Sequence, residues 1–565
     1  MNKDLLKEKV LAMYDVRGIQ DYIFKTNKAR EVIGASAIVE DIIVEGLKEY
    51  VKENAKGEEK KYLVKWKEKE DPKDDKSKWR PSSTNANDAF IKDESDIQMQ
   101  VMFIGGGNAY VLFRTGELCS KVNRFLGKYV LDQTYSLNLA IAVVKYTGSY
   151  NKDYAEINTR MIEIKARMPQ SKPVGALPFM EIDPTTGFPI TSEEKFKDKT
   201  EFLCEESNLK REKLKKVLEE ENKKRIEQGK EPEEVDEKIF DNMVSEKGDN
   251  STLAIIHIDG NSLGKRIKDA MEEVDGYDKA IETMRDLSLE INNTFEESFH
   301  KMTAYMDEEC KKDKKLSKTD NKKYRKIVVA GDDITYICNA KLAIPSVKKF
   351  IQVLNSKSSK TFNIFSACAG IAFFNSHFPF SDAYKVAEAC CESAKNRAKI
   401  NPKDNMPITC DEKVGNFFDY QMCTNVNASE IDSYRDKHYR YDGESFIYRP
   451  YYVEVSEDNR EEDKKNKDLN KDLNNMFKKY SCSLLDEKLN VILDKSFPRS
   501  LAKEIRSVIP QGNNEIDKEI SFLESRCYTQ FSDLKEKKGI YYDACELMDL
   551  QLEGDNNNGS TEDQN

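Results

Sequence analysis

Residues 328–337 read VVAGDDITYI, and this stretch decides the fold. Two runs of strand-forming residues flank a glycine and two adjacent carboxylates, Asp332 and Asp333. Because a strand interior disfavours Asp, the pattern predicts a hairpin whose turn carries both side chains. Such a turn is common for purely structural reasons, since Gly and Asp both favour turns. The two carboxylates therefore either only shape the turn or hold something positively charged.

The bulk composition limits the classes of protein that fit. With 565 residues the chain is too long for one core, and three or four domains are expected. Charged residues make up 34% of the chain and the net charge is -11, which argues against a surface coated for nucleic acid. It does not exclude a local basic groove.

The cysteines and histidines indicate neither a disulfide framework nor a zinc site. The 12 cysteines include no C-x-x-C pair, and there are only 4 histidines. The first residues lack the apolar core of a signal peptide, and no apolar run approaches membrane-spanning length. We therefore predict a cytoplasmic protein without membrane contact, whose thiols are reduced and mostly buried.

Two parts of the chain repeat one pattern of strands and helices. Each has a strand running into a helix, then a strand–turn–strand hairpin, then a further strand: VLAMYDVRGIQDYIF (10–24), MQVMFIGGGNAYVLF (99–113) and LNLAIAVVKY (137–146) in the first, and LAIIHIDGNSLGKRI (253–267), KIVVAGDDITYI (326–337) and FSACAGIAFF (365–374) in the second. A closing helix is predicted over 151–166 and over 381–400. This order predicts an α+β chain with two ferredoxin-like layers, each with helices on one face of an antiparallel sheet.

The second repeat places a further carboxylate, Asp259, at the end of its first strand. We expect the first strand and the strand entering the hairpin to be neighbours at the sheet centre, which would bring Asp259 close to Asp332 and Asp333. Carboxylates so close repel one another unless cations bind, and oxygen ligands suit Mg²⁺ or Mn²⁺. We therefore predict a catalytic metal site of these three residues with Gly260. Alternatively, Asp259 only caps the helix that follows.

The segments around these carboxylates favour phosphate binding. Gly260 lets the backbone approach a phosphate, and DGNSLGKRI opens a helix whose N-terminus favours anions. Lys395 and Lys399 are four residues apart, so they share a helix face and could both reach a triphosphate, although lysines are usually solvated surface. The predicted nucleotide-binding residues are Asn261, Ser262, Gly264, Gly331, Lys395, Lys399, Gly106 and Gly107.

These motifs resemble a known family. The second repeat, with CAGIAFFNSHFPFSDAYKVAEACCESAKNRAK (368–399), resembles the second palm domain of the large polymerase-like subunit of type III CRISPR effector complexes. DVRGIQDYIFKTNKAREVIGASAIVEDI (15–42) with FIGGGNAYVLF (103–113) resembles that subunit's first, non-catalytic palm, and RYDGESFIYRPYY (440–452) resembles the end of its second palm. The resemblance covers residues 11–453, interrupted by charged insertions.

The resemblance implies synthesis of cyclic oligoadenylate from ATP, with Mg²⁺ or Mn²⁺, at a site between two palms. It implies that Asp259, Asp332 and Asp333 are the metal ligands and that Lys395 contacts phosphate. The paired palms are similar to dimeric nucleotidyl cyclase-like domains, so the fold expected is a pseudo-dimer with a helical insertion and a helical C-terminal region.

The expected domains follow from the repeats and the composition. They are a first palm domain at 1–192 with a polar insertion at 52–88, a charged helical insertion at 193–250, a second palm domain at 251–455, a helical C-terminal domain at 456–552 and a disordered tail at 553–565. Within the insertion, residues 210–240 predict a solvated helix pair broken at 229–232.

The sequence departs from the family pattern at several positions. Ala330 replaces the first glycine of the usual Gly-Gly-Asp-Asp, and Asn261 replaces an acidic residue. No His-Asp dipeptide occurs, so we expect no HD nuclease domain. The cysteine set that binds zinc between the palms in many members is missing as well. The partners implied are ATP and, within a CRISPR complex, subunits that dock on the C-terminal helices together with target RNA. A stand-alone relative in anti-phage signalling is the other expectation; the sequence does not indicate homo-oligomerisation.

Three functions are compatible with this site. The first is a metal-dependent nucleotidyltransferase that makes cyclic oligonucleotides. The second is a catalytically silent scaffold subunit that binds nucleotide, which Ala330 and Asn261 favour. The third is a cyclase with a mononucleotide product. Three clustered carboxylates have no use in a scaffold, and this favours an enzyme.

Overall fold

The computed structural model describes residues 5–26, 28–64, 90, 96–105, 107–168, 177–196, 199–227, 243–244, 252–272, 274, 276–318, 322–359, 362–376, 378–423, 431–455 and 464–552. The chain divides into two compact units. The first comprises Met1–Glu237, Leu263–Asn293 and Ile327–Gly331, and the second comprises Lys238–Ser262, Thr294–Lys326 and Asp332–Asn565. Among the described residues, no helix is both long enough and apolar enough to cross a membrane.

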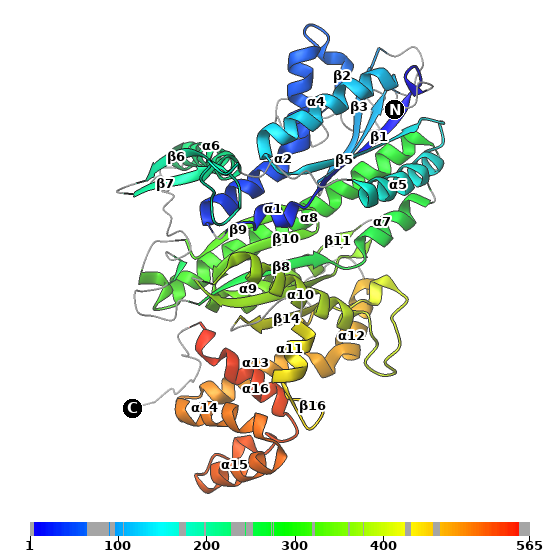
Figure 1. The fold of residues 1–565 in the computed structure, drawn as a ribbon. Coiled ribbons are helices and arrows are strands. Elements are labelled where there is room, and N and C mark those ends of the chain that lie inside the picture. The colour runs from blue at the N-terminus through cyan, green and yellow to red at the C-terminus, as the bar shows by residue number, and fades with distance from the viewer. Residues whose placement is uncertain are drawn as a thin grey trace. The chain divides into compact units, whose positions relative to one another are not determined.

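The first repeat forms a five-stranded sheet of order β2-β3-β4-β1-β5 (Figure 1). Its strands are β1 (Val10–Arg17), β2 (Tyr62–Leu63), β3 (Met99–Gly105), β4 (Asn108–Phe113) and β5 (Asn138–Lys145). Its helices are α1 (Ile19–Ile23), α2 (Ala29–Asn54), α4 (Gly116–Thr134) and α5 (Tyr150–Arg167). The strand β1 is central and pairs antiparallel with both β4 and β5. This confirms the ferredoxin-like order expected from the sequence.

The second repeat forms a six-stranded sheet of order β17-β14-β13-β8-β10-β9. Its strands are β8 (Thr252–Gly260), β9 (Tyr324–Ala330), β10 (Asp333–Asn339), β13 (Ala367–Asn375), β14 (Phe417–Met422) and β17 (Tyr451–Tyr452). The helices of this repeat are α7 (Leu263–Glu272), α8 (Tyr277–Lys312), α9 (Ala340–Asn355) and α10 (Phe380–Ala398). The remaining short elements are β11 (Ser358–Ser359), β12 (Asn363–Ile364), α11 (Ile431–His438), β15 (Arg440–Tyr441) and β16 (Glu444–Ser445).

The expected neighbour of the first strand was wrong. The strand that leaves the hairpin, β10, pairs with β8, whereas the entering strand β9 lies at the sheet edge. The chain passes from β8 to β9 through α7 and α8. The tight hairpin then places β10 between the strands β8 and β9. The same order holds in the first sheet, where β4 lies between β3 and β1. The approach of Asp259 to the hairpin survives the correction, because β10 itself begins at Asp333.

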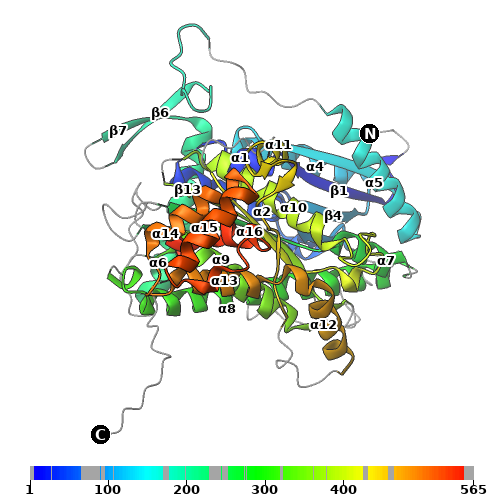
Figure 2. The same ribbon diagram turned by 90° about the horizontal axis from the view of Figure 1, so that it is seen from below.

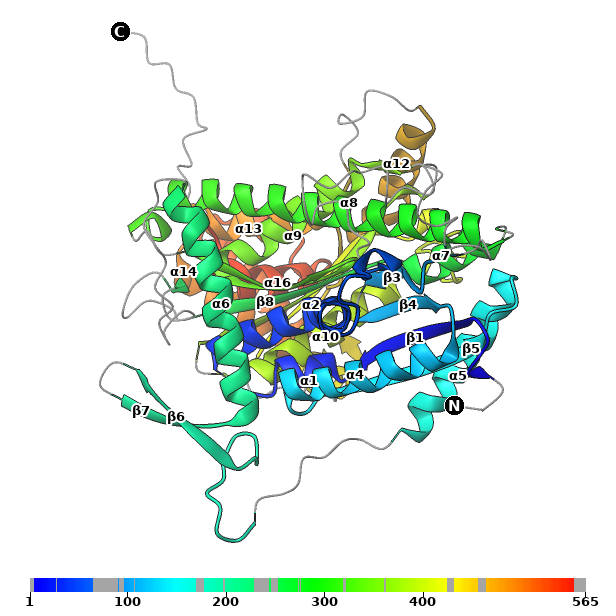
Figure 3. The same cartoon turned by 90° about the horizontal axis from the view of Figure 1, so that it is seen from above.

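The described part of the charged insertion begins with a hairpin that the sequence did not predict. This hairpin is β6 (Ile190–Phe196) and β7 (Lys199–Cys204), and the helix α6 (Glu205–Glu227) follows it (Figure 3). The start of α6 is not solvated, because Lys210 and Arg211 are buried. Arg211 donates to the carboxylates of Glu31, Glu194 and Glu201.

The close packing of α2 on α6 explains this burial. A Cβ added at Gly34 of α2 would lie 1.9 Å from the carbonyl oxygen of Lys210, so only glycine permits the helix contact. The Lys210 ammonium then donates to Glu206 and to the carbonyl of Tyr22. A charge pattern alone could not distinguish these buried pairs from a solvated face.

Several predicted segments lie outside the described residues. They are most of the polar insertion 52–88, the second helix expected in the insertion 193–250, much of the charge run that opens the domain 456–552, and the tail 553–565. The described beginning of the polar insertion completes α2 and then supplies β2 to the first sheet.

The C-terminal region is helical, as the sequence predicted. It contains α12 (Lys464–Phe477), α13 (Cys482–Leu493), α14 (Arg499–Val508), α15 (Asn513–Ser525) and α16 (Lys538–Leu547). The helices α13 to α16 gather into one bundle, coloured orange to red in Figure 2.

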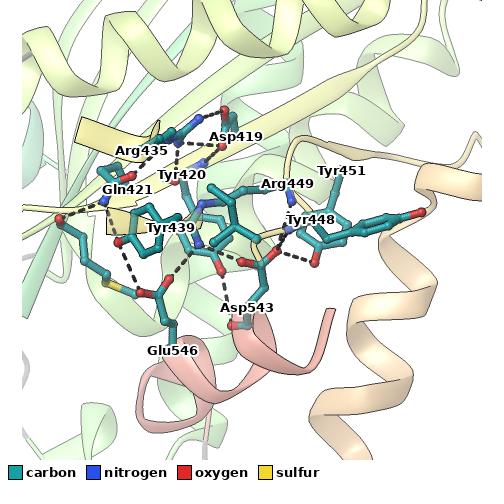
Figure 4. Close-up of polar contacts among 12 residues, drawn as sticks. Asp419, Tyr420, Gln421, Arg435, Tyr439, Tyr448, Arg449, Tyr451, Asp543 and Glu546 are labelled. Carbon is teal, nitrogen blue, oxygen red and sulfur yellow. Dashed lines mark hydrogen bonds and ion pairs between the residues drawn. The ribbon is translucent and has the colours of Figure 1, made fainter. Parts of the chain in front are cut away.

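A buried ionic cluster joins α16 to the end of the second sheet (Figure 4). Arg449 precedes β17, and its Nη1 donates to Asp543 at 2.8 Å and to Glu546 at 2.7 Å. Asp543 also accepts the backbone N–H groups of Tyr448 and Arg449 and the hydroxyl of Tyr451. Burial raises the pKa of Asp543, and the Arg449 guanidinium opposes this shift. The helix is thus held by buried ion pairs of Arg449 with Asp543 and Glu546.

The cluster continues to the strand β14. Tyr439 donates to Glu546, and Gln421 donates to the Tyr439 hydroxyl at 3.0 Å. Arg435 of α11 donates to Gln421 and forms two hydrogen bonds with Asp419, as Figure 4 shows. These contacts connect the C-terminal bundle with the strand beside β13, so the bundle is part of the second unit's stable core.

We predict that Asp543→Ala destabilises the protein by about 3–5 kcal/mol, because it removes one of the two carboxylates that pair with the buried Arg449. The matched control is Asp517→Ala on α15, whose carboxylate pairs with Lys535 on the exposed surface and should contribute at most about 1 kcal/mol. Urea unfolding followed by circular dichroism compares the two. Equal midpoints for both variants would contradict the anchoring role of Asp543.

Candidate active site at the GDD hairpin

The hairpin between β9 and β10 is a two-residue turn of Gly331 and Asp332. Gly331 has a φ of 66°, which a residue with a side chain rarely adopts, and Asp332 has no positive φ. A positive φ at the first central residue alone is typical of a type II′ turn, which requires glycine there. The turn therefore explains Gly331 and leaves Asp332 and Asp333 unexplained.

Asp259 and the hairpin carboxylates lie at the same edge of the sheet. The β8–β10 ladder ends with Ile258 opposite Ile334, so Asp259 and Asp333 are the next residues in register. The residues alternate between faces along each strand, which places Asp259 on the same face as His257, and Asp333 on the same face as Thr335. The sheet topology thus brings the three predicted carboxylates together.

The helix α10 supplies a cation to this edge. Lys395 Nζ lies 2.6 Å from Asp259 Oδ2, with both side chains partly buried. Burial lowers the pKa of Lys395, but the Asp259 charge more than offsets it and the net shift is upward. The predicted phosphate ligand is therefore already engaged with the first carboxylate.

The hairpin carboxylates are electrostatically unfavourable as they stand. Burial, reinforced by the charge of Asp259, raises the pKa of Asp332 to about 6. Burial, with the charges of Asp259 and Asp332, raises the pKa of Asp333 to about 7. One buried oxygen of Asp333, Oδ1, accepts no hydrogen bond. A cation bound here would offset the repulsion between the carboxylates and would give the unpartnered oxygen of Asp333 a partner.

A cavity of about 560 Å³ opens beside Asp259. This volume lies in the range of small-molecule sites in proteins. Besides Asp259 and Lys395, the cavity is lined by His257 of β8 and by Lys385, Glu388, Ala389, Cys391 and Glu392 of α10. Sequence reasoning missed most of these residues. The spacing of Lys385, Glu388, Glu392 and Lys395 gave a usable signal, because residues three or four apart share one face of a helix.

The other predicted nucleotide-binding residues have different positions. Asn261 is buried; its side chain donates to the carbonyl of Gly415 at 3.0 Å, and its backbone N–H donates to Ser366. It therefore faces the protein interior and does not line the cavity. Ser262 has a φ of 56° in the turn before α7, and Lys399 is exposed at the end of α10. Gly260, predicted at the metal site, pairs with Ala367 of β13.

The glycines predicted for nucleotide binding fall in the first unit. Gly264 lies in α7, Gly331 in the hairpin turn, and Gly107 has a φ of 80° in the turn between β3 and β4. Gly106 lies outside the described residues. The roles of these glycines remain predictions.

The first repeat carries a counterpart of this site without the hairpin carboxylates. Asp15 of β1 pairs with Lys165 of α5, as Asp259 pairs with Lys395. Lys165 and Lys395 each lie 15 residues after the first residue of their helix. Opposite Asp15 stands Asn108, at the position that Asp333 takes in the second repeat. The lysine–aspartate pair is thus common to both repeats, and the extra carboxylates belong to the second alone.

The donor atoms of the second repeat fit a hard divalent cation. Asp259, Asp332 and Asp333 offer only oxygen, and the unpartnered Oδ1 of Asp333 is an available ligand atom. As the side chains stand, no group of three His, Cys, Asp or Glu residues in the described part of the chain is arranged to hold a metal ion. In this structure Asp259 pairs with Lys395 through Oδ2.

Residues 252–406 match the family model of the Cas10/Cmr2 second palm domain. This segment is a Cas10-type palm domain. The match begins at the first residue of β8 and extends past α10, so it contains the three carboxylates, Lys395 and the cavity. No curated protein sequence matches the chain.

The chain is also similar to solved Csm1–Csm4 cassettes, with TM-scores below 0.5. One in complex with cA4 is 11% identical with a TM-score of 0.40, and the alignment covers 71% of this chain and 56% of that chain. One in complex with one ATP is 12% identical with a TM-score of 0.45, covering 96% and 70%. The apo cassette is 12% identical with a TM-score of 0.43, covering 96% and 70%. The chain thus spans little more than half the length of the first.

We predict that the metal-free palm domain loses stability as pH rises from about 4 to about 7. The folded pKa of Asp333 is raised, so in this window the folded state binds more protons than the unfolded state and the free energy of unfolding falls. Asp333→Asn should be more stable than wild type at pH 8 and should lose this advantage toward pH 4. Thermal melts of both proteins in EDTA between pH 4 and pH 8 measure this difference in stability.

The control for the pH experiment is Asp132→Asn, which changes an exposed carboxylate on α4. Its melting temperature should follow that of the wild type at every pH. A constant difference between Asp333→Asn and wild type across the whole range would contradict the raised pKa of Asp333.

Proposed function

We propose that the chain is a metal-dependent nucleotidyltransferase that converts ATP into a cyclic oligoadenylate with release of pyrophosphate. The observation that carries the proposal is the cluster of Asp259, Asp332 and Asp333 at one sheet edge of a Cas10-type palm domain. The hairpin needs Gly331 but neither aspartate, and burial together with the clustered charges raises the pKa of both aspartates. Residues kept at an electrostatic cost are candidates for a functional site.

The proposed metal is Mg²⁺ or Mn²⁺, held by Asp259, Asp332 and Asp333. When bound, such an ion neutralises charge on the phosphates and lowers the pKa of an attacking hydroxyl. The carboxylates supply oxygen ligands only, which suit these ions. A cation in the cluster would share Asp259 with Lys395 or displace the lysine from it.

Lys395 is the proposed phosphate ligand. Its ammonium pairs with Asp259 beside the cavity, so a triphosphate in the cavity would offer it a second anionic partner. When Lys395 moves from Asp259 to the phosphate, the lysine holds the nucleotide and the Asp259 carboxylate becomes free. One lysine thus links nucleotide binding to completion of the carboxylate site.

The proposed reaction is an in-line displacement at the α-phosphorus of ATP. The 3′-hydroxyl oxygen of one nucleotide bonds to the α-phosphorus of another, the bond to the β-phosphate oxygen breaks, pyrophosphate leaves and the hydroxyl proton passes to water. Repetition lengthens the chain, and attack by the terminal 3′-hydroxyl on the 5′-terminal α-phosphorus closes the ring. The residues of the palm domain contribute position and charge, and no covalent intermediate with the protein is required.

A silent nucleotide-binding scaffold is the second candidate. The observation that favours it is the Lys395–Asp259 ion pair, which satisfies one carboxylate without a metal. Asn261 adds no ligand, since it faces the interior. Nucleotide binding without any product, including in the presence of guide and target RNA, would support the scaffold over the enzyme. For the enzyme we also propose a role in antiviral CRISPR signalling, with partner subunits that dock on the helices α13–α16.

We predict that the purified chain, incubated with ATP and Mn²⁺ or Mg²⁺, releases pyrophosphate and yields a product whose mass is a multiple of the adenylate unit without a terminal phosphate. Mass spectrometry with each of the four nucleoside triphosphates also distinguishes a cyclic mononucleotide. Asp332→Ala combined with Asp333→Ala should abolish the product.

The matched control is Asp15→Asn, which alters the equivalent first-strand carboxylate in the repeat without hairpin aspartates. It should retain product formation. Undiminished activity of the double variant would refute the assignment of the site, whereas nucleotide binding with no product from the wild type would favour the scaffold.

We predict that Lys395→Met weakens ATP binding by about 10- to 100-fold, because it removes a hydrogen bond from a charged donor to phosphate, typically about 1.5–3 kcal/mol. Lys165→Met, at the equivalent position of the first repeat, is the control and should change the affinity much less. Isothermal titration with a non-hydrolysable ATP analogue and Mg²⁺ measures both. Equal losses in the two variants would show that Lys395 has no special role.

A further inference from the structure

A histidine interrupts the apolar strand that leads to Asp259. The strand β8 reads TLAIIHIDG, and His257 is buried in it between two isoleucines. Burying a polar ring costs free energy unless the ring finds partners. His257 packs edge-on against Tyr384 of α10, with ring centroids 5.7 Å apart, and it also lines the cavity beside Asp259.

One nitrogen of this ring faces two oxygen atoms of β10. His257 Nδ1 lies 3.2 Å from Thr335 Oγ1 and 3.4 Å from Asp333 Oδ1. Thr335 is the cross-strand partner of His257, and Asp333 lies two residues earlier on the same face. The Asp333 oxygen is the one that accepts no hydrogen bond, and a carboxylate can only accept. Nδ1 therefore lies within ion-pair distance of this oxygen, while its hydrogen bond in this structure is with Thr335 Oγ1.

The first repeat gives an internal comparison. Its register pairs Asp15 with Asn108 and Met13 with Tyr110, so Met13 stands where the second repeat has His257. The repeat without a hairpin carboxylate fills this buried position with an apolar side chain. The fold therefore does not require a histidine at this position, and the histidine occurs in the repeat that has the hairpin carboxylate.

We propose that His257 is a positioning residue for Asp333, holding the carboxylate toward Asp259 through an N–H on Nδ1. The proposal rests on the proposed function, because it assigns the residue to the same metal site. Partners that hydrogen-bond a metal ligand fix its orientation, and their loss typically weakens metal binding about 10- to 100-fold. Thr335 Oγ1 contacts the same ring nitrogen, at 3.2 Å. The alternative is a core histidine whose only partner is the Thr335 hydroxyl.

The test compares three variants by isothermal titration with MnCl₂ alone. His257→Met introduces the residue of the first repeat and preserves the packing; it should bind Mn²⁺ about 10- to 100-fold more weakly than wild type. His257→Asn keeps an N–H near the position of Nδ1 and should stay close to wild type. Thr335→Val removes only the hydroxyl and should also stay close. The proposal is overturned if His257→Met binds like wild type, or if Thr335→Val loses as much affinity as His257→Met.

A second measurement needs no metal and no activity. In metal-free crystals, the Asp333 carboxylate should keep one orientation in wild type and His257→Asn and turn away in His257→Met. An unchanged carboxylate in His257→Met would overturn the positioning role even if wild type binds Mn²⁺. A wild type that binds neither Mn²⁺ nor ATP would instead refute the proposed function, and the crystal structures would still decide the role of His257.

Discussion

The site depends on the close contact between α10 and the sheet at Gly370. A Cβ at this position would lie 1.8 Å from the carbonyl oxygen of Ala387 and 2.3 Å from the backbone nitrogen of Cys391. Any side chain would push the helix away, because a close-packed interior has no room for an added methyl group. Gly370 is opposite His257 on β8. The helix α10 that packs on Gly370 therefore lies over β8, the strand that carries Asp259. The contact of Lys395 with Asp259 follows from this packing.

The charges at the sheet edge are unbalanced within the second unit. Three carboxylates share one lysine that pairs with Asp259, and the pKa values of both hairpin aspartates are raised. In the first repeat, Asp15 and Lys165 form the same pair with no excess charge, since Asn108 replaces the hairpin carboxylate. When ionised, Asp332 and Asp333 thus add two negative charges that Lys395 alone does not balance. A divalent cation supplies the missing charge, and a triphosphate gives Lys395 another partner.

Much of this site could be predicted from local sequence patterns. The GDD turn, the end of the first strand and the closing helix each follow from strand and helix periodicity, and the ferredoxin-like order then brings Asp259, Asp332 and Asp333 together. The position of Lys395 followed from the resemblance. What could not be predicted depends on contacts between distant residues. Asn261 faces inward because it meets the carbonyl of Gly415, 154 residues away. Lys210 and Arg211 are buried because Gly34 admits α6.

The most direct test of the carboxylate site is the anomalous signal of Mn²⁺ in crystals grown with a non-hydrolysable ATP analogue. The account predicts a Mn²⁺ peak bound by Asp259, Asp332 and Asp333, with Lys395 moved from Asp259 to a phosphate oxygen. An unchanged ion pair between Lys395 and Asp259, with no Mn²⁺ peak at the hairpin while the nucleotide is bound, would contradict it.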